Sequence, residues 1–536
     1  MKATFLGAAQ TVTGSCYIIE DENVRFAVDC GLHQGNKEIE KRNVDMKDYN
    51  PENLDFVLIT HAHIDHTGLL PRLVKFGFKG KIYLTAPTKE LLEIMLLDSA
   101  HIQEMEALWN NQKKMRHGSK ELVEPLYTES DAESVFPLFE VVEYDKQFKP
   151  CEDVCITYRD AGHILGSSII EAAFEGEDRP CKVVFSGDLG RPHQLLVNDP
   201  SFIESTDYLI MESTYGDRDH KDSGNSKDEL AEAIRYSYRQ RQKVVIPAFA
   251  VERTQQIIYT LFQLSLEGRL PDDMPVYLDS PLAIRATEIF RKHPEFFDAE
   301  FQAYLDKGLN PLDLKNLVFT QTTEESQAIN NTKGPAIVIS ASGMANAGRI
   351  KHHLRHNLWK KGASIIFVGY QAVGTPGRKI VNGASSIRIF GEDISVEAKI
   401  FTINGFSGHA GRSELLEWLE NFKEKNMKLV LTHGDPEAQQ KLAEVIEERF
   451  DIPVHIPGYL EQITFDPATE RTAVVAPARK PRGVDWDFLL QDSENLLTEM
   501  RKRIAEAEKL SWEEQTEIRD RLLDINRHIV EFISEL

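Results

Sequence analysis

Short apolar runs rich in β-branched residues alternate with polar turns over the first two hundred residues, and this pattern predicts β-strands. The predicted strands cover residues 17–20, 24–28, 54–60, 81–84, 154–158, 169–174, 182–185 and 208–211. Several of them are followed at once by an acidic or imidazole side chain, namely Asp29, His61, Asp188 and Glu212. In layered α/β proteins, sites are assembled at that edge of a sheet.

From about residue 227 to 395 the pattern changes to strand followed by helix. KVVIPAFA precedes ERTQQIIYTLFQLSLEG, PVYLDS precedes PLAIRATEIFRKH, and PAIVISASG precedes a helix expected over 348–359. Such alternation predicts parallel βαβ units and therefore a second α/β domain. The pattern of the first two hundred residues then returns in FTING, a helix over 413–422 and KLVLTHG. The second domain is therefore predicted to be inserted into the first.

Two amphipathic helices are expected at the end of the chain, over 492–510 and 511–536. The second opens with the capping pattern Ser511-Trp512-Glu513-Glu514. Its apolar positions follow a 4-3-4-3 spacing: Ile518, Leu522, Ile525, Ile529 and Phe532. Such a stripe fits packing against the body of the protein and a homodimer surface equally well, and both remain open.

Composition limits the classes of partner. The 536 residues exceed one ordinary domain, and 62 Lys and Arg against 85 Asp and Glu give a net charge of −23. A surface of this sign repels polyanions, so any nucleic-acid contact has to be local. The five cysteines form no C-x-x-C pair, and no apolar run reaches the ~18 residues of a membrane span. We therefore expect a cytoplasmic protein without a membrane partner.

The strongest chemical signal is the run His61-Ala62-His63-Ile64-Asp65-His66, directly after the predicted strand 54–60. Imidazole and carboxylate ligands suit Zn(II) and, less well, Mn(II) or Fe(II). On a tight loop, His61 and His63 can face one ion while Asp65 and His66 reach a second. One loop can thus serve two ions.

Further ligands are needed for a dinuclear site, and three separated residues lie in suitable places. His163 lies in the glycine-flanked turn DAGHILGS, Asp188 follows the strand in VVFSGDLG, and His433 ends KLVLTHGD. Each residue alone would favour an ordinary structural role. Together with the His61 to His66 run, these positions favour metal ligation.

H-x-H-x-D-H, followed by His163, Asp188 and His433, resembles the ligand series of the metallo-β-lactamase fold. Asp29 in VDCG matches the first signature of that fold, which supports the metal loop without binding metal. The insertion, with Glu212 in MESTYG and His409 in FSGHAG, is similar to the β-CASP subgroup of nucleic-acid hydrolases. The resemblance covers roughly residues 1–465 and is nearer the RNA 3′-end cleavage and polyadenylation-specificity type than the RNase J type.

The resemblance implies an α/β fold: an αββα metallo-β-lactamase sandwich with an inserted α/β β-CASP domain and a helical C-terminal extension. The expected limits are 1–212 and 399–465 for the two parts of the sandwich, 213–398 for the β-CASP domain, and 466–536 for the extension.

The resemblance also implies a mechanism. One zinc ion would be held by His61, His63 and His163, and the other by Asp65, His66 and His433, with Asp188 bridging; Mn²⁺ or Fe²⁺ are alternatives. The ions would convert a shared water into the attacking hydroxide. His409 is the expected general acid for the leaving ribose 3′-oxygen, Glu212 would orient it, and Asp65, Glu212 and His409 are the expected catalytic residues.

Two glycine-rich turns in the insertion are candidates for binding the RNA, which is expected to be single-stranded. Ser342 and Gly343 precede a predicted helix with Arg349 at its start, and Arg378 follows the second turn. Such turns can present backbone N–H groups to phosphate. Three histidines on the predicted helix, His352, His353 and His356, are interpreted as a solvated or phosphate-facing patch rather than a third metal site.

Two rival functions are a small-molecule metallohydrolase and a non-catalytic RNA-binding subunit. The domain-sized gap between Asp188 and His409 counts against the first. The filled ligand positions count against the second. Endonuclease or 5′-exonuclease action, and RNA or DNA preference, remain open.

Overall fold

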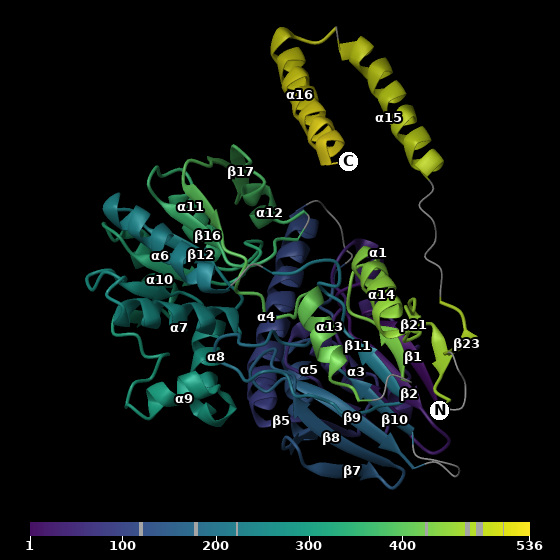
Figure 1. Ribbon diagram of the computed structural model, residues 1–536. Helices are drawn as coiled ribbons and strands as arrows, with labels where there is room; N and C mark the ends of the chain where they lie inside the picture. The colour runs from purple at the N-terminus through teal and green to yellow at the C-terminus, as the bar shows by residue number, and fades with distance from the viewer. Residues whose placement is uncertain are drawn as a thin grey trace. The chain divides into compact units, whose positions relative to one another are not determined.

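The computed structural model describes residues 1–116, 122–175, 181–220, 223–372, 374–423, 427–466, 472–478, 486–507 and 509–535 (Figure 1). The chain forms two compact units, Met1–Arg479 and Lys480–Leu536. All predicted site residues belong to the first unit.

Two sheets form one of the two parts of this unit, and the inserted domain forms the other. The eight-stranded sheet runs in the order β23-β22-β1-β2-β3-β4-β5-β6 and the seven-stranded sheet in the order β21-β20-β11-β10-β9-β8-β7. The strands of the first sheet are β1 (Lys2–Gly7), β2 (Cys16–Glu20), β3 (Arg25–Val28), β4 (Phe56–Leu58), β5 (Lys81–Thr85), β6 (Phe139–Val142), β22 (Gln462–Thr464) and β23 (Ala473–Ala476). Those of the second are β7 (Gln147–Cys151), β8 (Val154–Asp160), β9 (Ser168–Phe174), β10 (Cys181–Phe185), β11 (Tyr208–Met211), β20 (Lys428–Leu431) and β21 (Val454–His455).

The two sheets pack face to face through alternate apolar side chains. Tyr17 of β2 stacks on Phe185 of β10 with ring centroids 6.3 Å apart, and Phe26 of β3 stacks on Phe174 of β9 at 6.1 Å. These rings belong to one buried cluster that draws on both sheets. Interdigitation of inward-facing residues is what holds a sandwich of this kind together.

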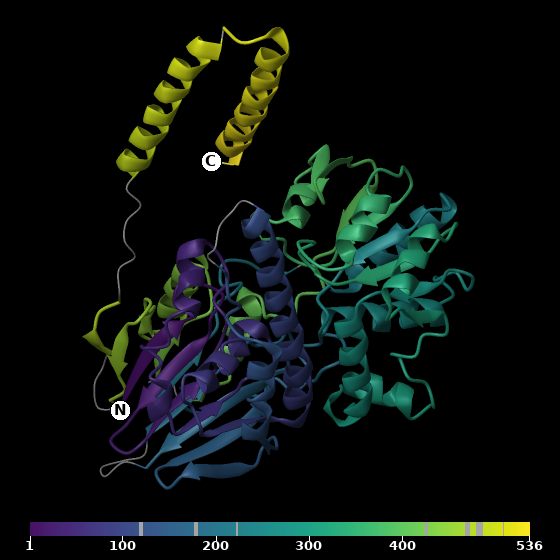
Figure 2. The same cartoon turned by 180° about the vertical axis from the view of Figure 1, so that it is seen from behind.

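Helices cover both outer faces of the sandwich (Figure 2). Leu73, Leu91 and Leu96 share a buried cluster with the outer face of the first sheet. Leu415, Leu419 and Leu442 share one with the outer face of the second. The helices are α1 (Lys37–Glu40), α2 (Ile64–Thr67), α3 (Leu70–Lys75), α4 (Ala86–Arg116), α5 (Glu129–Glu133), α13 (Arg412–Glu420) and α14 (Pro436–Phe450). The predicted αββα sandwich is confirmed.

The inserted domain follows β11 and is built on a six-stranded, fully parallel sheet in the order β14-β13-β15-β12-β16-β19. Its strands are β12 (Val244–Pro247), β13 (Val276–Leu278), β14 (Leu317–Phe319), β15 (Ile337–Ser340), β16 (Ser364–Phe367) and β19 (Lys399–Thr402). Its helices are α6 (Ser223–Arg239), α7 (Arg253–Leu266), α8 (Pro281–Lys292), α9 (Ala299–Leu305), α10 (Thr323–Asn331), α11 (Ile350–Asn357) and α12 (Pro376–Val381). The parallel βαβ pattern predicted from the sequence is therefore correct, and the hairpin of β17 (Ser386–Ile389) and β18 (Glu392–Ser395) adds to it.

Three details of the insertion differ from the sequence interpretation. Lys399–Thr402, expected to begin the second part of the sandwich, is instead β19, the edge strand of the inserted sheet. The helix expected over 348–359 is shorter, because Gly348 has a left-handed φ of 77° and α11 begins only at Ile350. His353 does not belong to a solvated patch, since it is fully buried and its Nε2 lies 2.6 Å from Asp279 Oδ2. A buried carboxylate needs such a partner.

The second unit consists of α15 (Trp486–Ala507) and α16 (Trp512–Glu535). Ser511 caps α16 as the sequence predicts: its Oγ accepts from Glu514 N at 3.3 Å, and Glu514 Oε2 accepts from Ser511 N at 3.0 Å. The side chain of Phe532 lies outside the described part of the chain. None of the described helices combines the length and apolar character needed to cross a bilayer.

Candidate metal centre

The site forms where parallel strands of both sheets end. β3 and β4 are parallel neighbours in one sheet, and β10, β11 and β20 are parallel neighbours in the other. Their carboxyl ends therefore meet at one edge of the sandwich, which carries Asp29, His61, Asp188, Glu212 and His433. The loops pack so closely here that a Cβ on Gly31 would lie 1.6 Å from the carbonyl oxygen of Asp65. Only glycine permits that approach.

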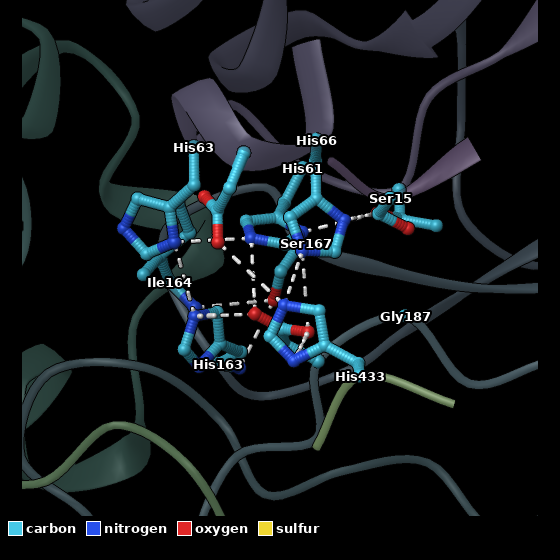
Figure 3. A network of polar contacts seen from close by, with 12 residues as sticks. Ser15, His61, His63, His66, His163, Ile164, Ser167, Gly187 and His433 are labelled. Atoms are coloured by element: carbon cyan, nitrogen blue, oxygen red, sulfur yellow. Dashed lines mark hydrogen bonds and ion pairs between the residues drawn. The ribbon is translucent and has the colours of Figure 1, made fainter. Parts of the chain in front are cut away.

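The histidine rings point toward one another at this edge (Figure 3). His61 Nε2 lies 3.0 Å from His63 Nδ1, and His163 Nε2 lies 3.3 Å from the same His63 atom. On the other side, His66 Nε2 lies 3.2 Å from His433 Nε2, and Asp65 Oδ2 lies 3.5 Å from His433 Nε2. Residues that lie as much as several hundred positions apart in the sequence thus form two adjacent groups of donor atoms.

Asp188 lies between the two groups. Its Oδ2 is 3.4 Å from His61 Nε2 and 3.6 Å from His163 Nε2, whereas its Oδ1 is 3.4 Å from His66 Nε2. The carboxylate is 2% exposed, and Oδ1 makes no hydrogen bond to any described residue. One oxygen is therefore directed at each group, which is the arrangement of a bridging ligand.

The second ring nitrogen of each of four histidines has an oxygen partner, and that of His433 also lies 3.5 Å from Asp188 Oδ1. Nδ1 of His61 lies 3.0 Å from Thr60 Oγ1, and Nδ1 of His66 donates to Asp29 Oδ2 at 2.7 Å. The remaining two contacts are His163 Nδ1 to Gly408 O and His433 Nδ1 to Thr214 Oγ1, both at 3.0 Å. Such partners orient a ligating imidazole and fix which nitrogen is free for the metal. Asp29 therefore holds the His66 ring in position.

Burial sets the protonation of the first group. Loss of solvation lowers the pKa of His61 and His163 well below the ordinary value and that of His63 to about 4. These rings are neutral at physiological pH and keep a lone pair for a cation. Burial opposes charge on His66 too, but the carboxylates of Asp188 and Asp29 outweigh it and raise its pKa.

The donor set fits two divalent cations. Zn–N bonds of about 2.0–2.1 Å place neighbouring ligand atoms of a tetrahedron roughly 3.3 Å apart, which is close to the nitrogen separations in both groups. The hydrogen-bond-free Asp188 Oδ1 supplies a buried anionic atom that needs a cation or a donor. Imidazole and carboxylate donors favour zinc, with manganese or iron as alternatives.

His409 lies beside this centre, next to Glu212. Its Nδ1 is 3.3 Å from both carboxylate oxygens of Glu212 and 3.8 Å from Asp188 Oδ2. Burial lowers the pKa of His409, but the Glu212 and Asp188 carboxylates outweigh it and raise the pKa to about 9. Glu212 Oε1 also accepts from Leu189 N at 2.6 Å, so the carboxylate is held in place.

The residues expected to bind substrate divide into two sets. Gln371 Nε2 donates to Gly343 O at 3.1 Å, so the Ser342–Gly343 turn and the turn before Arg378 lie side by side. Arg349 is instead engaged inside the fold, where its Nη1 donates to Asp279 Oδ1 at 2.8 Å and to Thr320 O at 3.1 Å.

Sequence reasoning missed several residues that shape the site: Thr60, Thr214, Gln194 and Glu252. Gln194 Nε2 donates to His163 O at 3.2 Å, and Glu252 Oε2 accepts from Leu165 N at 3.3 Å. Thr60 directly precedes His61 and Thr214 lies two residues after Glu212, which was the available signal. Gln194 and Glu252 reach the His163 loop from distant segments, and their sequence context gives no signal.

Three family models match the chain. They are described as a metallo-beta-lactamase superfamily domain over residues 18–208, a Beta-Casp domain over 254–380, and a Zn-dependent metallo-hydrolase RNA specificity domain over 393–457. Their order agrees with the sandwich, the insertion and the return to the sandwich.

The chain is also similar to curated proteins. It is 35% identical over 449 residues to ribonuclease TTHA0252 of Thermus thermophilus, a match covering 84% of this chain and 96% of the relative. It is 29% identical to the transcription termination factor FttA of Methanosarcina mazei and 30% identical to that of Methanothermobacter thermautotrophicus, each match covering 86% of this chain and 71% of the relative. The chain belongs to the metallo-β-lactamase-fold β-CASP family of RNA-processing nucleases.

Proposed function

We propose that this protein is a zinc-dependent ribonuclease that hydrolyses phosphodiester bonds of single-stranded RNA, with His409 as general acid. The observation that carries the proposal is the Asp188 carboxylate, which directs one oxygen at each of two groups of metal-binding side chains. Family membership supports the nuclease class, and the RNA specificity model supports RNA as the substrate.

Two zinc ions bound here would supply an activated water and positive charge for the phosphate oxygens. His61, His63 and His163 would hold one, Asp65, His66 and His433 the other, and Asp188 would bridge them. Asp29, Thr60, Gly408 and Thr214 hold the ligating rings in position.

His409 supplies the proton for the leaving group. In hydrolysis, the water oxygen bonds to phosphorus, the bond from phosphorus to the ribose 3′-oxygen breaks, and the 3′-oxygen takes a proton. Glu212 holds His409 Nδ1, which leaves Nε2 to donate that proton. General acid catalysis of this kind contributes about 10²–10⁴ in rate.

The test compares hydrolysis of a labelled oligoribonucleotide by wild type, His63→Ala and His409→Ala, all loaded with zinc. We expect His63→Ala to lose metal and activity together, and His409→Ala to keep its metal while its kcat falls about 10²–10⁴-fold. His356→Ala is the matched control, because this histidine is exposed on α11. Unchanged turnover in His63→Ala would refute the catalytic assignment, whereas RNA binding without hydrolysis by the zinc-loaded wild type would favour an RNA-binding subunit.

Substrate class and mode of action need two further comparisons. Nitrocefin and a glutathione thioester test the small-molecule rival, and we expect neither to be hydrolysed at a rate comparable to RNA. RNAs of one sequence with a 5′-monophosphate, a 5′-hydroxyl or a circular backbone test the mode. Cleavage of the circle would establish endonuclease action, and a strict demand for the 5′-phosphate would establish 5′-exonuclease action.

A further inference from the structure

An exposed tyrosine with two arginines is connected through neighbouring side chains to His409, the proposed proton donor. Tyr370 follows β16, and 48% of its surface is exposed. The guanidinium carbons of Arg218 and Arg378 each lie 5.9 Å from the centre of its ring. Arg218 comes from the segment after β11, whereas Tyr370 and Arg378 come from the inserted domain, so the group joins both parts of the first unit.

An unbroken series of contacts connects this group to His409. The guanidinium carbon of Arg218 lies 4.8 Å from the ring centre of Tyr215. The Tyr215 ring in turn lies 6.0 Å from the His409 ring. The series runs from the proposed proton donor, through Tyr215 and Arg218, to the exposed face of Tyr370.

Both sides of the group are held by backbone contacts. Arg412 N donates to Arg218 O at 3.0 Å, and Ser413 N donates to Asp219 Oδ1 at 2.7 Å, so the Tyr215–Asp219 turn is fixed to the segment that carries His409. Gln371 Nε2 donates to Tyr370 O at 3.2 Å and fixes the other side. Arg218 also pairs with Asp217 at 3.0 Å, but an exposed pair of this kind is weak and does not prevent contact with phosphate.

An exposed aromatic ring with guanidinium groups beside it is suited to an unpaired nucleotide. The ring stacks on the base, which every nucleotide offers, and the guanidiniums meet the phosphates. The chemistry also fixes the position of that nucleotide relative to the cut. Because His409 gives its proton to the leaving 3′-oxygen, we assign the group that Tyr215 and Arg218 connect to His409 to the nucleotide that carries this oxygen.

We propose that Tyr370, with Arg218 and Arg378, forms a stacking subsite for the base of the leaving nucleotide, the one on the 5′ side of the cleaved bond. This inference rests on the proposed function and names the part of the RNA that this face holds. Stacking is tolerant of sequence, so the subsite selects single-stranded character and not a particular base.

The test removes the ring and the base separately. The main cleavage site of a short oligoribonucleotide is mapped, and a second substrate lacks only the base on the 5′ side of that site. Stacking of one base on an aromatic ring strengthens binding by about 5- to 160-fold. We expect wild type to cleave the intact substrate with a kcat/KM about tenfold above the abasic one, and Tyr370→Ala to cleave both at the abasic value.

Two controls complete the comparison. Tyr370→Phe keeps the ring and should keep the preference for the intact substrate. Trp359→Ala removes another exposed aromatic ring of the inserted domain, one that lies 5.7 Å from Lys360 Nζ, and should leave the preference unchanged. A Tyr370→Ala protein that retains the full wild-type preference would overturn the subsite.

A measurement of RNA binding distinguishes a wrong subsite from a wrong proposed function. Affinity for a uridine dodecamer and for its fully abasic counterpart is measured by fluorescence anisotropy in the slow His409→Ala background. Adding Tyr370→Ala should weaken binding of the intact oligomer about tenfold and leave that of the abasic oligomer unchanged. Equal weakening of both, or of neither, contradicts the subsite even if the metal-loaded wild type hydrolyses no RNA.

Discussion

Single residues that hydrogen-bond to the proposed metal ligands fix the orientation of those ligands. Asp29 accepts from His66 Nδ1 at 2.7 Å and from Thr60 N at 2.9 Å, so one carboxylate orients a ligating ring and the start of the metal loop. The ligands themselves were predictable because they lie at strand ends in short motifs. Thr60 and Thr214 were not predicted, because an isolated threonine has many ordinary roles and only the folded chain shows what its hydroxyl contacts.

Replacing Asp29 by asparagine should weaken the metal site without removing a ligand. The amide keeps the size of the side chain but loses the negative charge that holds the His66 N–H. We expect metal affinity to fall about 10–100-fold, as measured by competition with a chromophoric chelator. Glu106→Gln changes an exposed carboxylate on α4 and serves as the control; an Asp29→Asn affinity equal to that of this control would contradict the role of Asp29.

Replacing Glu212 by glutamine should change the pH dependence of kcat. Although burial lowers the pKa of His409, its neighbours raise it to about 9, and Glu212 is the largest favourable contributor. A general acid works only below its pKa, so wild type should lose activity as the pH rises through the pKa of His409. Loss of the Glu212 charge should move this decline to lower pH by about one unit or more. A decline at the same pH in both proteins would show that His409 is not the acid.

At the scale of elements, strand ends and a turn of the inserted domain together position the His163 loop. Glu252, which precedes α7, has a φ of 64° and a ψ of −61°, and Arg253 N donates to Val251 O at 2.9 Å, which closes a γ-turn. This turn directs the Glu252 carboxyl at Leu165 N. The sequence predicted the helices and strands on either side from their periodicity, but not this contact, because Leu165 and Glu252 are far apart in the chain.

Glu252 should make stability depend on pH. Burial raises its pKa to about 8, so the folded chain keeps a proton that the unfolded chain releases above a pKa of about 4.3. The free energy of unfolding should therefore fall as the pH rises from about 4.3 to 8, by at most about 5 kcal/mol. Urea unfolding across this range should show a smaller fall for Glu252→Gln than for wild type. Parallel curves for the two proteins would mean that Glu252 does not keep its proton.

At the scale of the whole molecule, the sequence predicted the order of sandwich, insertion, sandwich and helices. It did so because strand and site motifs like those before residue 212 return in KLVLTHG, and because HAHIDH marks one family of folds. The boundary at 399 was wrong, since Lys399–Thr402 is β19 at the edge of the inserted sheet. The apolar stripe of α16 predicted a packing surface but not its partner, since an amphipathic face carries no information about what covers it. The same limit applies to Arg349 and His353, whose pairing with Asp279 depends on packing in the parallel sheet.

Removal of residues 480–536 should leave RNA hydrolysis intact. Every proposed ligand, His409 and the Tyr370 group lie within Met1–Arg479, which forms a compact unit of its own. We expect kcat/KM on a short oligoribonucleotide to stay within about twofold of the full chain, since no binding or catalytic group is lost. A large loss with normal metal content would place part of the substrate site in the second unit.

The central claim is that distant segments bring together a pair of cations that hydrolyse RNA. Its most direct test is elemental analysis of the freshly purified protein, with RNA hydrolysis followed on the same sample before and after chelation. The account predicts close to two transition-metal ions per chain, a marked loss of metal in Asp188→Asn, and hydrolysis that disappears with chelation and returns with zinc. Full hydrolysis by protein free of transition metal would contradict it.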